Sequence, residues 1–189
     1  MILNIFEGKK IRLRAVEITD LENYFCNGEE IDTPAQRSGD RARLPMSKTV
    51  MRERVESLAN MIPGYEECFM IIEDKAGNAV GNINTHTCSR VDGTFEYGLG
   101  VRSKHRCNGY ASEAIKLVLN FYFNELNYQK ANVRVYSYNY ESKGLHEKLG
   151  FVHEGIIRRS FYGNGKFHDI LCYGMTREEF NEKYRVNMK

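Results

Sequence analysis

The order in which strand patterns and helix patterns alternate is the feature that most restricts the fold of this chain. Three strand patterns between residues 68 and 101 follow one another through short turns, such as Asp-Lys-Ala-Gly-Asn at residues 74–78, which indicates antiparallel pairing. Elsewhere helix patterns separate successive strands, and such connections require some parallel pairing. The sequence therefore predicts a mixed, mostly antiparallel sheet of the α+β class with helices on both faces. We expect its strands at residues 10–16, 68–73, 79–87, 94–101, 131–138, 151–157 and 167–175.

Five segments between or after these strands carry helix signals. The strongest signal covers residues 111–122, where apolar residues recur at helical spacing. The other four segments begin with capping residues or end at a glycine or proline. They lie at residues 19–25, 47–62, 142–149 and from 176 onward. The polar residues 28–44 predict a loop. Because no linker interrupts this series, we expect one domain over residues 10–180.

Length and composition fit one globular domain. The chain has 189 residues, of which 42% are hydrophobic and 28% charged, which excludes a wholly disordered chain, a collagen and a coiled-coil rod. The apolar runs are far shorter than the roughly 20 residues that span a membrane, and the N-terminus shows no signal-peptide pattern. A net charge of +2 with mixed signs argues against a nucleic-acid partner. We therefore expect neither nucleic acid nor a membrane as a partner.

The cysteines indicate a reducing compartment. The chain has five of them, an odd number at wide spacing and without a Cys-x-x-Cys pair. This pattern argues against both a disulfide framework and a zinc site. We expect a cytoplasmic protein without a bound metal.

Several common catalytic motifs fail on their spacing. The sequence Gly-Leu-Gly-Val-Arg-Ser at residues 98–103 lacks the third glycine of a dinucleotide fingerprint. There is no phosphate-binding Gly-x-x-x-x-Gly-Lys-Ser/Thr loop and no Gly-x-Ser-x-Gly elbow. His146-Glu147 is followed by Gly150 where a zinc protease needs its second histidine. These classes of enzyme are therefore excluded.

Residues 101–114 are the most informative segment, because a strand enters it and the strongest helix leaves it. The first amides of a helix have no partner within the helix and attract anions. Gly109 permits a left-handed turn and the close approach of a phosphate, and cationic or donor side chains precede it at residues 104–106. These residues alone fit either a phosphate site or a solvated basic turn.

Three motifs in this chain resemble the GNAT N-acetyltransferase superfamily. Residues 106–111, Arg-Cys-Asn-Gly-Tyr-Ala, resemble its Arg/Gln-x-x-Gly-x-Gly/Ala loop, whose amides hold the pyrophosphate of coenzyme A. Residues 139–151 are similar to its Asn-x-x-Ser/Ala segment that ends in Lys-Leu-Gly-Phe, and Glu-Tyr-Gly at 96–98 matches the strand that receives pantetheine. The resemblance runs from about residue 10 to 180. Within the superfamily, the resemblance is nearest to the branch that acetylates ribosomal-protein N-termini and, in related enzymes, spermidine. Cys107 departs from the pattern, since the family usually has glycine there.

The resemblance implies a single-domain GNAT fold and transfer of acetyl from acetyl-coenzyme A to a primary amine. In that family the amine attacks the thioester directly in a ternary complex, without a metal. The acceptor would be a small-molecule amine or a protein N-terminus, and a homodimer is left open. The alternative is a regulatory module that binds coenzyme A without turnover. The resemblance implies as coenzyme-binding residues Leu99, Gly100, Val101, Arg106, Cys107, Asn108, Gly109, Tyr110, Ala111, Asn139 and Ser142.

Four side chains are candidates for the chemistry that the resemblance implies. Glu96 is the first candidate to take the amine proton, through a water, or to hold the ammonium, and His86 on the preceding strand is the second. His146 stands where many GNAT enzymes carry a tyrosine general acid, and Asp169 is a candidate to hold the acceptor amine. The alternative for each is a purely structural role, as a strand carboxylate that faces solvent or a core histidine whose hydrogen bonds are made within the protein. The sequence leaves open the acceptor, the choice of base and acid, and a role for Cys107.

Overall fold

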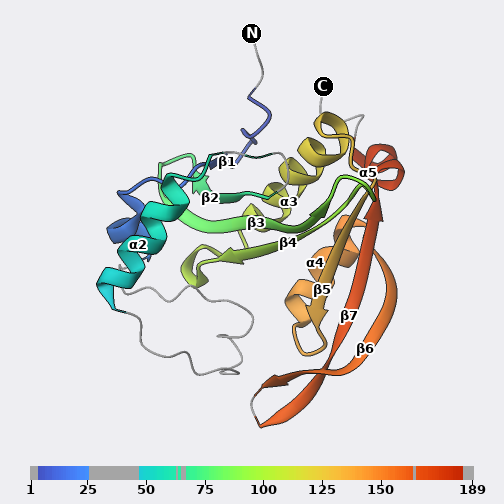
Figure 1. Cartoon of the computed structure of the whole chain (residues 1–189). Coiled ribbons are helices and arrows are strands. Elements are labelled where there is room, and N and C mark those ends of the chain that lie inside the picture. The colour runs from blue at the N-terminus through green and yellow to red at the C-terminus, as the bar shows by residue number, and fades with distance from the viewer. Residues whose placement is uncertain (1–3, 26–46, 63, 65–66, 164, 185–189) are drawn as a thin grey trace.

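The structure is a computed structural model that describes residues 4–25, 47–62, 64, 67–163 and 165–184 (Figure 1). Its sheet has seven strands in the order β1-β2-β3-β4-β5-β7-β6. The strands are β1 (Ile11–Arg14), β2 (Phe69–Asp74), β3 (Ala79–Ser89), β4 (Thr94–Val101), β5 (Lys130–Tyr136), β6 (Val152–Gly163) and β7 (Lys166–Thr176). The pair β4–β5 is parallel and the other neighbouring pairs are antiparallel. The predicted mixed, mostly antiparallel sheet is confirmed.

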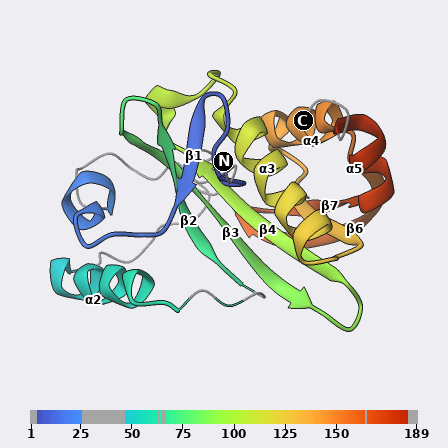
Figure 2. The same ribbon diagram turned by 90° about the horizontal axis from the view of Figure 1, so that it is seen from above.

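Helices cover both faces of this sheet, as predicted (Figure 2). One face carries α3 (Tyr110–Asn120), η3 (Phe121–Glu125), α4 (Tyr140–Leu149) and α5 (Arg177–Tyr184), and the other carries η1 (Leu21–Phe25) and α2 (Lys48–Ala59). A one-turn helix, η2 (Ser103–His105), follows β4. Among the described residues, no helix is long and apolar enough to cross a membrane.

Side chains of alternating direction in the strands give the protein two hydrophobic cores. In β2, Ile71 packs with Tyr24 and Val55 under η1 and α2. Its neighbour Ile72 points to the opposite face and belongs to the larger core, which includes Phe95 and lies under α3 and α4. The period of two along a strand thus places adjacent residues in different cores.

Most of the predicted elements are confirmed, and β6 is the main exception. The strand predicted to end at residue 157 continues to Gly163, because a break in register between Ile157 and Phe161 lets it bend and resume pairing with β7. Arg159 lies in this break with a φ of 52°, and its amide donates to Asp169 Oδ1 at 2.8 Å. In α2, which lies within the helix predicted at 47–62, Val50 is exposed and Val55 is buried. The predicted loop at 28–44 lies outside the described residues.

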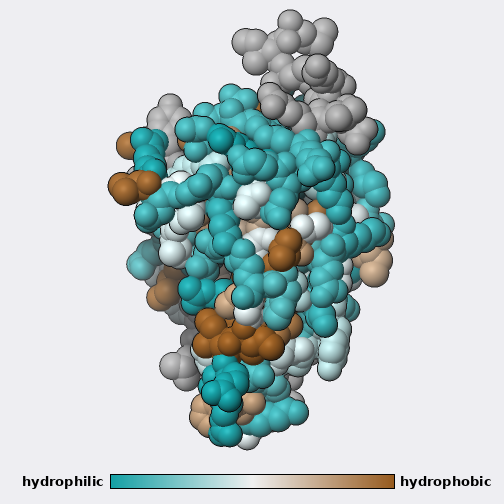
Figure 3. All heavy atoms as spheres, turned by 90° about the vertical axis from the view of Figure 1, so that its right-hand side faces the viewer, coloured by the Kyte–Doolittle hydropathy of each residue, from teal (hydrophilic) through white to brown (hydrophobic). Residues whose placement is uncertain are grey.

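The outer face of β6 and β7 carries exposed apolar side chains. Figure 3 shows this face, where a hydrophobic patch interrupts the hydrophilic surface. β6 is the last strand of the sheet, so its outer edge pairs with no other described strand. The exposed large hydrophobic residues on the two strands are Val152, Ile156, Ile157, Tyr162 and Phe167.

Candidate functional site

The turn that leads from β4 into α3 has the shape of an anion-binding cradle. Gly109 is the N-cap of α3 and has a left-handed backbone, with φ 83° and ψ 5°. Two residues earlier, Cys107 is also left-handed, with φ 62°. The Asn108 side chain donates to the carbonyl groups of His105 and Arg106 and braces the turn. The first amides of α3 therefore open onto a preformed, exposed turn.

A lysine from near the N-terminus, distant in sequence, contacts this turn. Lys10 Nζ donates to the carbonyl oxygen of Asn108 at 2.7 Å, and it would lie 3.1 Å from a Cβ added at Gly109. Sequence reasoning missed Lys10, because nothing in a one-dimensional pattern pairs residue 10 with residue 108. The backbone around Lys10 is held by Glu113 of α3, whose carboxylate accepts hydrogen bonds from the amides of Lys9, Lys10 and Ile11.

The parallel pairing of β4 with β5 ends after three residue pairs, from Thr94–Lys130 to Glu96–Asn132. Beyond Glu96, β4 keeps pairing with β3 only, and β5 keeps pairing with β7. The two strands therefore diverge along the second half of β4, the strand that leads toward the turn described above (Figure 1).

This divergence leaves backbone groups of β4 facing the gap. The Arg102 amide donates to the carbonyl of Val80 in β3, at 2.9 Å. Backbone groups alternate in direction along an antiparallel ladder, so the amides of Leu99 and Val101 point away from β3, toward the side where β5 has left. The amide of Gly100 points toward β3. Of the three predicted strand contacts, Leu99 and Val101 are thus oriented for a ligand.

The two predicted base candidates lie side by side on one sheet face. His86 of β3 is directly opposite Glu96 of β4 in the register. Glu96 is mostly buried, with a side-chain exposure of 13%, and its Oε1 lies 3.2 Å from the Arg134 guanidinium of β5. Arg134 was missed by sequence reasoning, because it reads as an ordinary exposed strand cation. The arrangement gives a carboxylate, an imidazole and a guanidinium at the point where β4 and β5 separate.

His146 lies on the opposite face, buried between α4 and β4. Its Nδ1 donates to the Ser142 carbonyl at 2.7 Å, so that in the neutral ring Nε2 accepts from the Tyr97 hydroxyl, 3.0 Å away. Burial lowers the pKa of His146, and the hydrogen bond to Ser142 opposes this only in part. Burial also raises the pKa of Tyr97. Both ring nitrogens are therefore engaged inside the protein, and the general-acid role that the resemblance implies for His146 stays a prediction.

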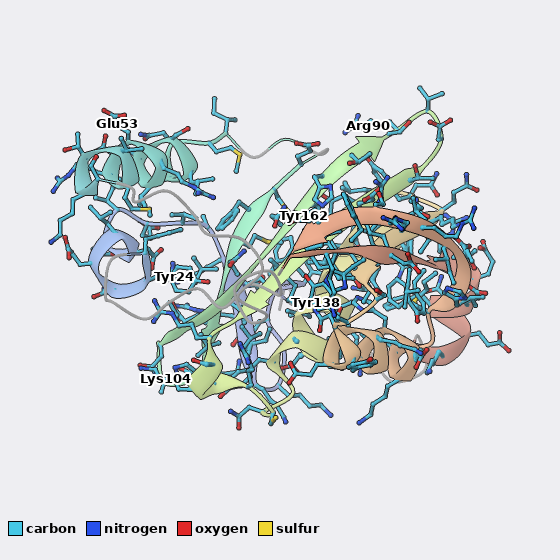
Figure 4. All side chains as sticks on the ribbon, turned by 90° about the horizontal axis from the view of Figure 1, so that it is seen from below. Tyr24, Glu53, Arg90, Lys104, Tyr138 and Tyr162 are labelled. Carbon is cyan, nitrogen blue, oxygen red and sulfur yellow. The ribbon has the colours of Figure 1, made fainter. Side chains whose placement is uncertain are left out.

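Three further predicted residues make structural contacts. Asn139 caps α4, because its side-chain oxygen accepts the Ser142 amide at 3.1 Å. Asp169, a candidate to hold the acceptor amine, accepts the amide of Arg159 in the β6 bulge. Ser142 and Asn139 both lie at the start of α4, on the β5–β7 half of the molecule. Seen from below, Tyr138 lies on this β5–β7 half, and Lys104 lies on the other half, near the end of β4 (Figure 4).

The described residues include no cluster of three or more His, Cys, Asp or Glu side chains that could hold a metal ion. Four of the cysteines fall in the described part of the chain and all four are free thiols.

Comparisons with known proteins agree on one family. The sequence pattern of the acetyltransferase (GNAT) domain matches residues 10–152, within the predicted domain. The chain is 39% identical over 180 residues to YokL, an uncharacterized prophage-derived N-acetyltransferase of Bacillus subtilis, covering 95% of this chain and 97% of that one. It is 26% identical to the putative ribosomal N-acetyltransferase YdaF of Bacillus subtilis over 104 residues, or 55% of this chain and 57% of that protein.

A solved structure shares the fold. The spermidine N-acetyltransferase of Vibrio cholerae, crystallised with CoA and spermine, superposes with a TM-score of 0.76 at 21% identity. The match covers 92% of this chain and 99% of that one. This likeness extends over nearly the entire sheet and its helices.

We expect His146 to make the protein less stable in acid. Its pKa is lowered in the folded state, so below about pH 6.5 the unfolded chain binds a proton that the folded protein refuses. Stability should fall as the pH drops through this range, with a slope of at most about 1.4 kcal/mol per pH unit. Urea unfolding at pH 7.5 and 5.5 measures this slope. His146→Gln removes the titrating group and keeps a polar side chain, so it should lose this part of the slope. An identical slope in both proteins would contradict the prediction.

We expect Cys107→Gly to stabilise the protein. A left-handed backbone costs a residue with a Cβ about 1–2 kcal/mol, and glycine avoids this at an entropic cost of roughly 0.5–1 kcal/mol. The net gain should be about 0.5–1 kcal/mol in urea unfolding. Cys107→Ala is the matched control, because it removes the thiol and keeps the Cβ. Equal stability of the two variants would show that the backbone of residue 107 is not strained.

Proposed function

Because the chain belongs to the GNAT acetyltransferase family, we propose that it transfers an acetyl group from acetyl-coenzyme A to a primary amine. The observation that carries this proposal is the divergence of β4 from β5 beyond Glu96, on the strand that leads to the Gly109 turn. The gap offers strand amides to an extended ligand arm, and the turn offers helix amides to a diphosphate. One extended ligand that carries both groups fits both features.

The described residues fit coenzyme A. At the turn, Gly109 lacks the Cβ that would crowd a phosphate, and Lys104 supplies a nearby cation. At the gap, the amides of Leu99 and Val101 are oriented to hold the pantetheine arm and to donate to the thioester oxygen as charge develops on it. Asn139 and Ser142 are proposed to contact the coenzyme from the start of α4. The other loop residues that we propose to bind the coenzyme are Arg106, Cys107, Asn108, Tyr110 and Ala111.

The chemistry needs a group that removes a proton from the amine. An alkyl ammonium has a pKa near 10.4, so the attacking nitrogen must first be deprotonated. Acetyl-coenzyme A supplies the activated acetyl thioester. The ammonium first gives one proton to a base, and the amine nitrogen then forms a bond to the acetyl carbon. The carbon–sulfur bond breaks, and the second proton that the nitrogen loses passes to the departing thiolate, which leaves as the coenzyme A thiol. We propose Glu96 as this base, through a water, with His86 next to it as the alternative. Arg134 holds the Glu96 carboxylate in place.

Two acceptor classes are proposed, a small-molecule amine and a protein N-terminus. The names of the similar proteins include both a spermidine and a ribosomal acetyltransferase. The alternative of a coenzyme-binding module without turnover predicts coenzyme binding but no release of thiol. We further propose a cytoplasmic location, which the free thiols favour. A homodimer stays a prediction, favoured by the exposed apolar side chains of β6 and β7.

We expect Glu96→Gln to lower kcat/KM for the amine by about 10²–10⁴-fold, because it keeps the shape of the side chain and removes the base. The assay follows thiol release from acetyl-coenzyme A with a panel of polyamines, amino acids and N-terminal peptides. The acidic limb of the pH profile should disappear in the same variant. His86→Gln is the matched control from the facing position and should lose less than about fivefold. The reverse ranking of the two variants would move the base to His86.

We expect Gly109→Ala to weaken coenzyme A binding by about 10–100-fold. An added methyl group that crowds a ligand costs about 1–3 kcal/mol. Gly77→Ala is the matched control. Gly77 is also left-handed, with φ 86° and open space around it, so it shares the backbone strain but lies in the β2–β3 turn. Calorimetry should show weaker binding for Gly109→Ala only. Equal affinities in the two variants would place the diphosphate elsewhere.

A further inference from the structure

The side chain of Lys10 lies across the turn at the start of α3, although it comes from the residue just before β1. Its ammonium donates to the Asn108 carbonyl at 2.7 Å. The three atoms nearest to a Cβ added at Gly109 all belong to Lys10, with Nζ at 3.1 Å. The space that glycine keeps open in this turn is therefore bordered by a positive charge.

The position of Lys10 is fixed by its backbone. The Glu113 carboxylate accepts the Lys9 amide at 2.7 Å, the Lys10 amide at 2.8 Å and the Ile11 amide at 3.2 Å. Glu113 lies in the first turn of α3, directly after the cradle. This anchor ties the beginning of β1 to the helix that carries the cradle. The Lys10 side chain consequently starts from a defined point and reaches the turn from outside it.

The ammonium uses one of its three donors on Asn108, and the residue is exposed. An ammonium beside helix amides adds a full charge to the partial positive charge of the helix end. A carbonyl is a weaker partner for an ammonium than a phosphate oxygen, because hydrogen bonds between two charged groups are stronger. An anion in the cradle would therefore draw the ammonium toward itself.

We propose that Lys10 is a further coenzyme-binding residue that contacts the diphosphate of acetyl-coenzyme A from the β1 side of the cradle. This inference rests on the proposed function and adds a residue to it that the loop motif does not contain. Lys10 would recognise phosphate oxygens only, and the pantetheine arm and the acetyl group would not depend on it.

The test compares Lys10→Met with Lys9→Met. Both remove one exposed lysine charge and keep an unbranched side chain, and both leave intact the backbone amides that Glu113 holds. Calorimetric titration with coenzyme A should show about tenfold weaker binding for Lys10→Met, and little change for Lys9→Met. Lys10→Arg should keep most of the affinity. Higher salt should weaken binding of the wild type more than that of Lys10→Met.

A second donor separates phosphate recognition from general damage to the site. S-acetylpantetheine carries the acetyl thioester without the diphosphate, so its kcat/KM should be the same in Lys10→Met and in the wild type. Equal coenzyme A affinities in the Lys10→Met and Lys9→Met variants would overturn the inference, and so would tighter binding by Lys10→Met. A wild-type protein that does not bind coenzyme A would instead overturn the proposed function.

Discussion

The separation of β4 from β5 is the constraint on which the rest of the molecule depends. Neighbouring strands normally satisfy each other's peptide groups, and unpaired edges inside a protein need another partner. Here the parallel ladder stops after Glu96, and each strand continues within its own antiparallel group. The three parallel pairs that end at Glu96 join the two groups, and the side chain of the next residue, Tyr97, is buried and hydrogen-bonded to His146 of α4. The sheet thus remains continuous while the peptide groups beyond Glu96 face a gap in which a ligand can bind.

The elements of the fold were predictable because their signals are local. Alternation and turn residues predicted β4 with its observed bounds, Thr94–Val101, and the capping box at Thr176 is present, with reciprocal bonds to Glu179. The course of β6 was not predictable, because its continuation depends on a bulge. The left-handed Arg159 in that bulge is held by Asp169 of a different strand, a contact that no local pattern contains.

The candidate site was predictable where it is contiguous and not where it is assembled from distant segments. The cradle follows from a short motif around Gly109, whose positive φ only glycine adopts without strain. Lys10 and Arg134 reach the site through strand register and helix packing, which the sequence does not encode locally. The motif also suggested an acid role for His146, but the role of a histidine depends on its hydrogen-bond partners, which only the folded chain defines.

The Glu113 carboxylate changes how variants of this protein should be interpreted. It contacts three backbone amides at the start of β1 and belongs to none of the motifs that point to coenzyme A. A substitution there would release the start of β1 and the adjacent Lys10. Under the proposed role of Lys10, such a variant would bind coenzyme A more weakly, although no contact between Glu113 and the coenzyme is proposed. Surveys of genetic variation that rank positions by their distance from a ligand would underestimate such a residue. Glu113 therefore couples the edge of the sheet at β1 to the turn at the start of α3.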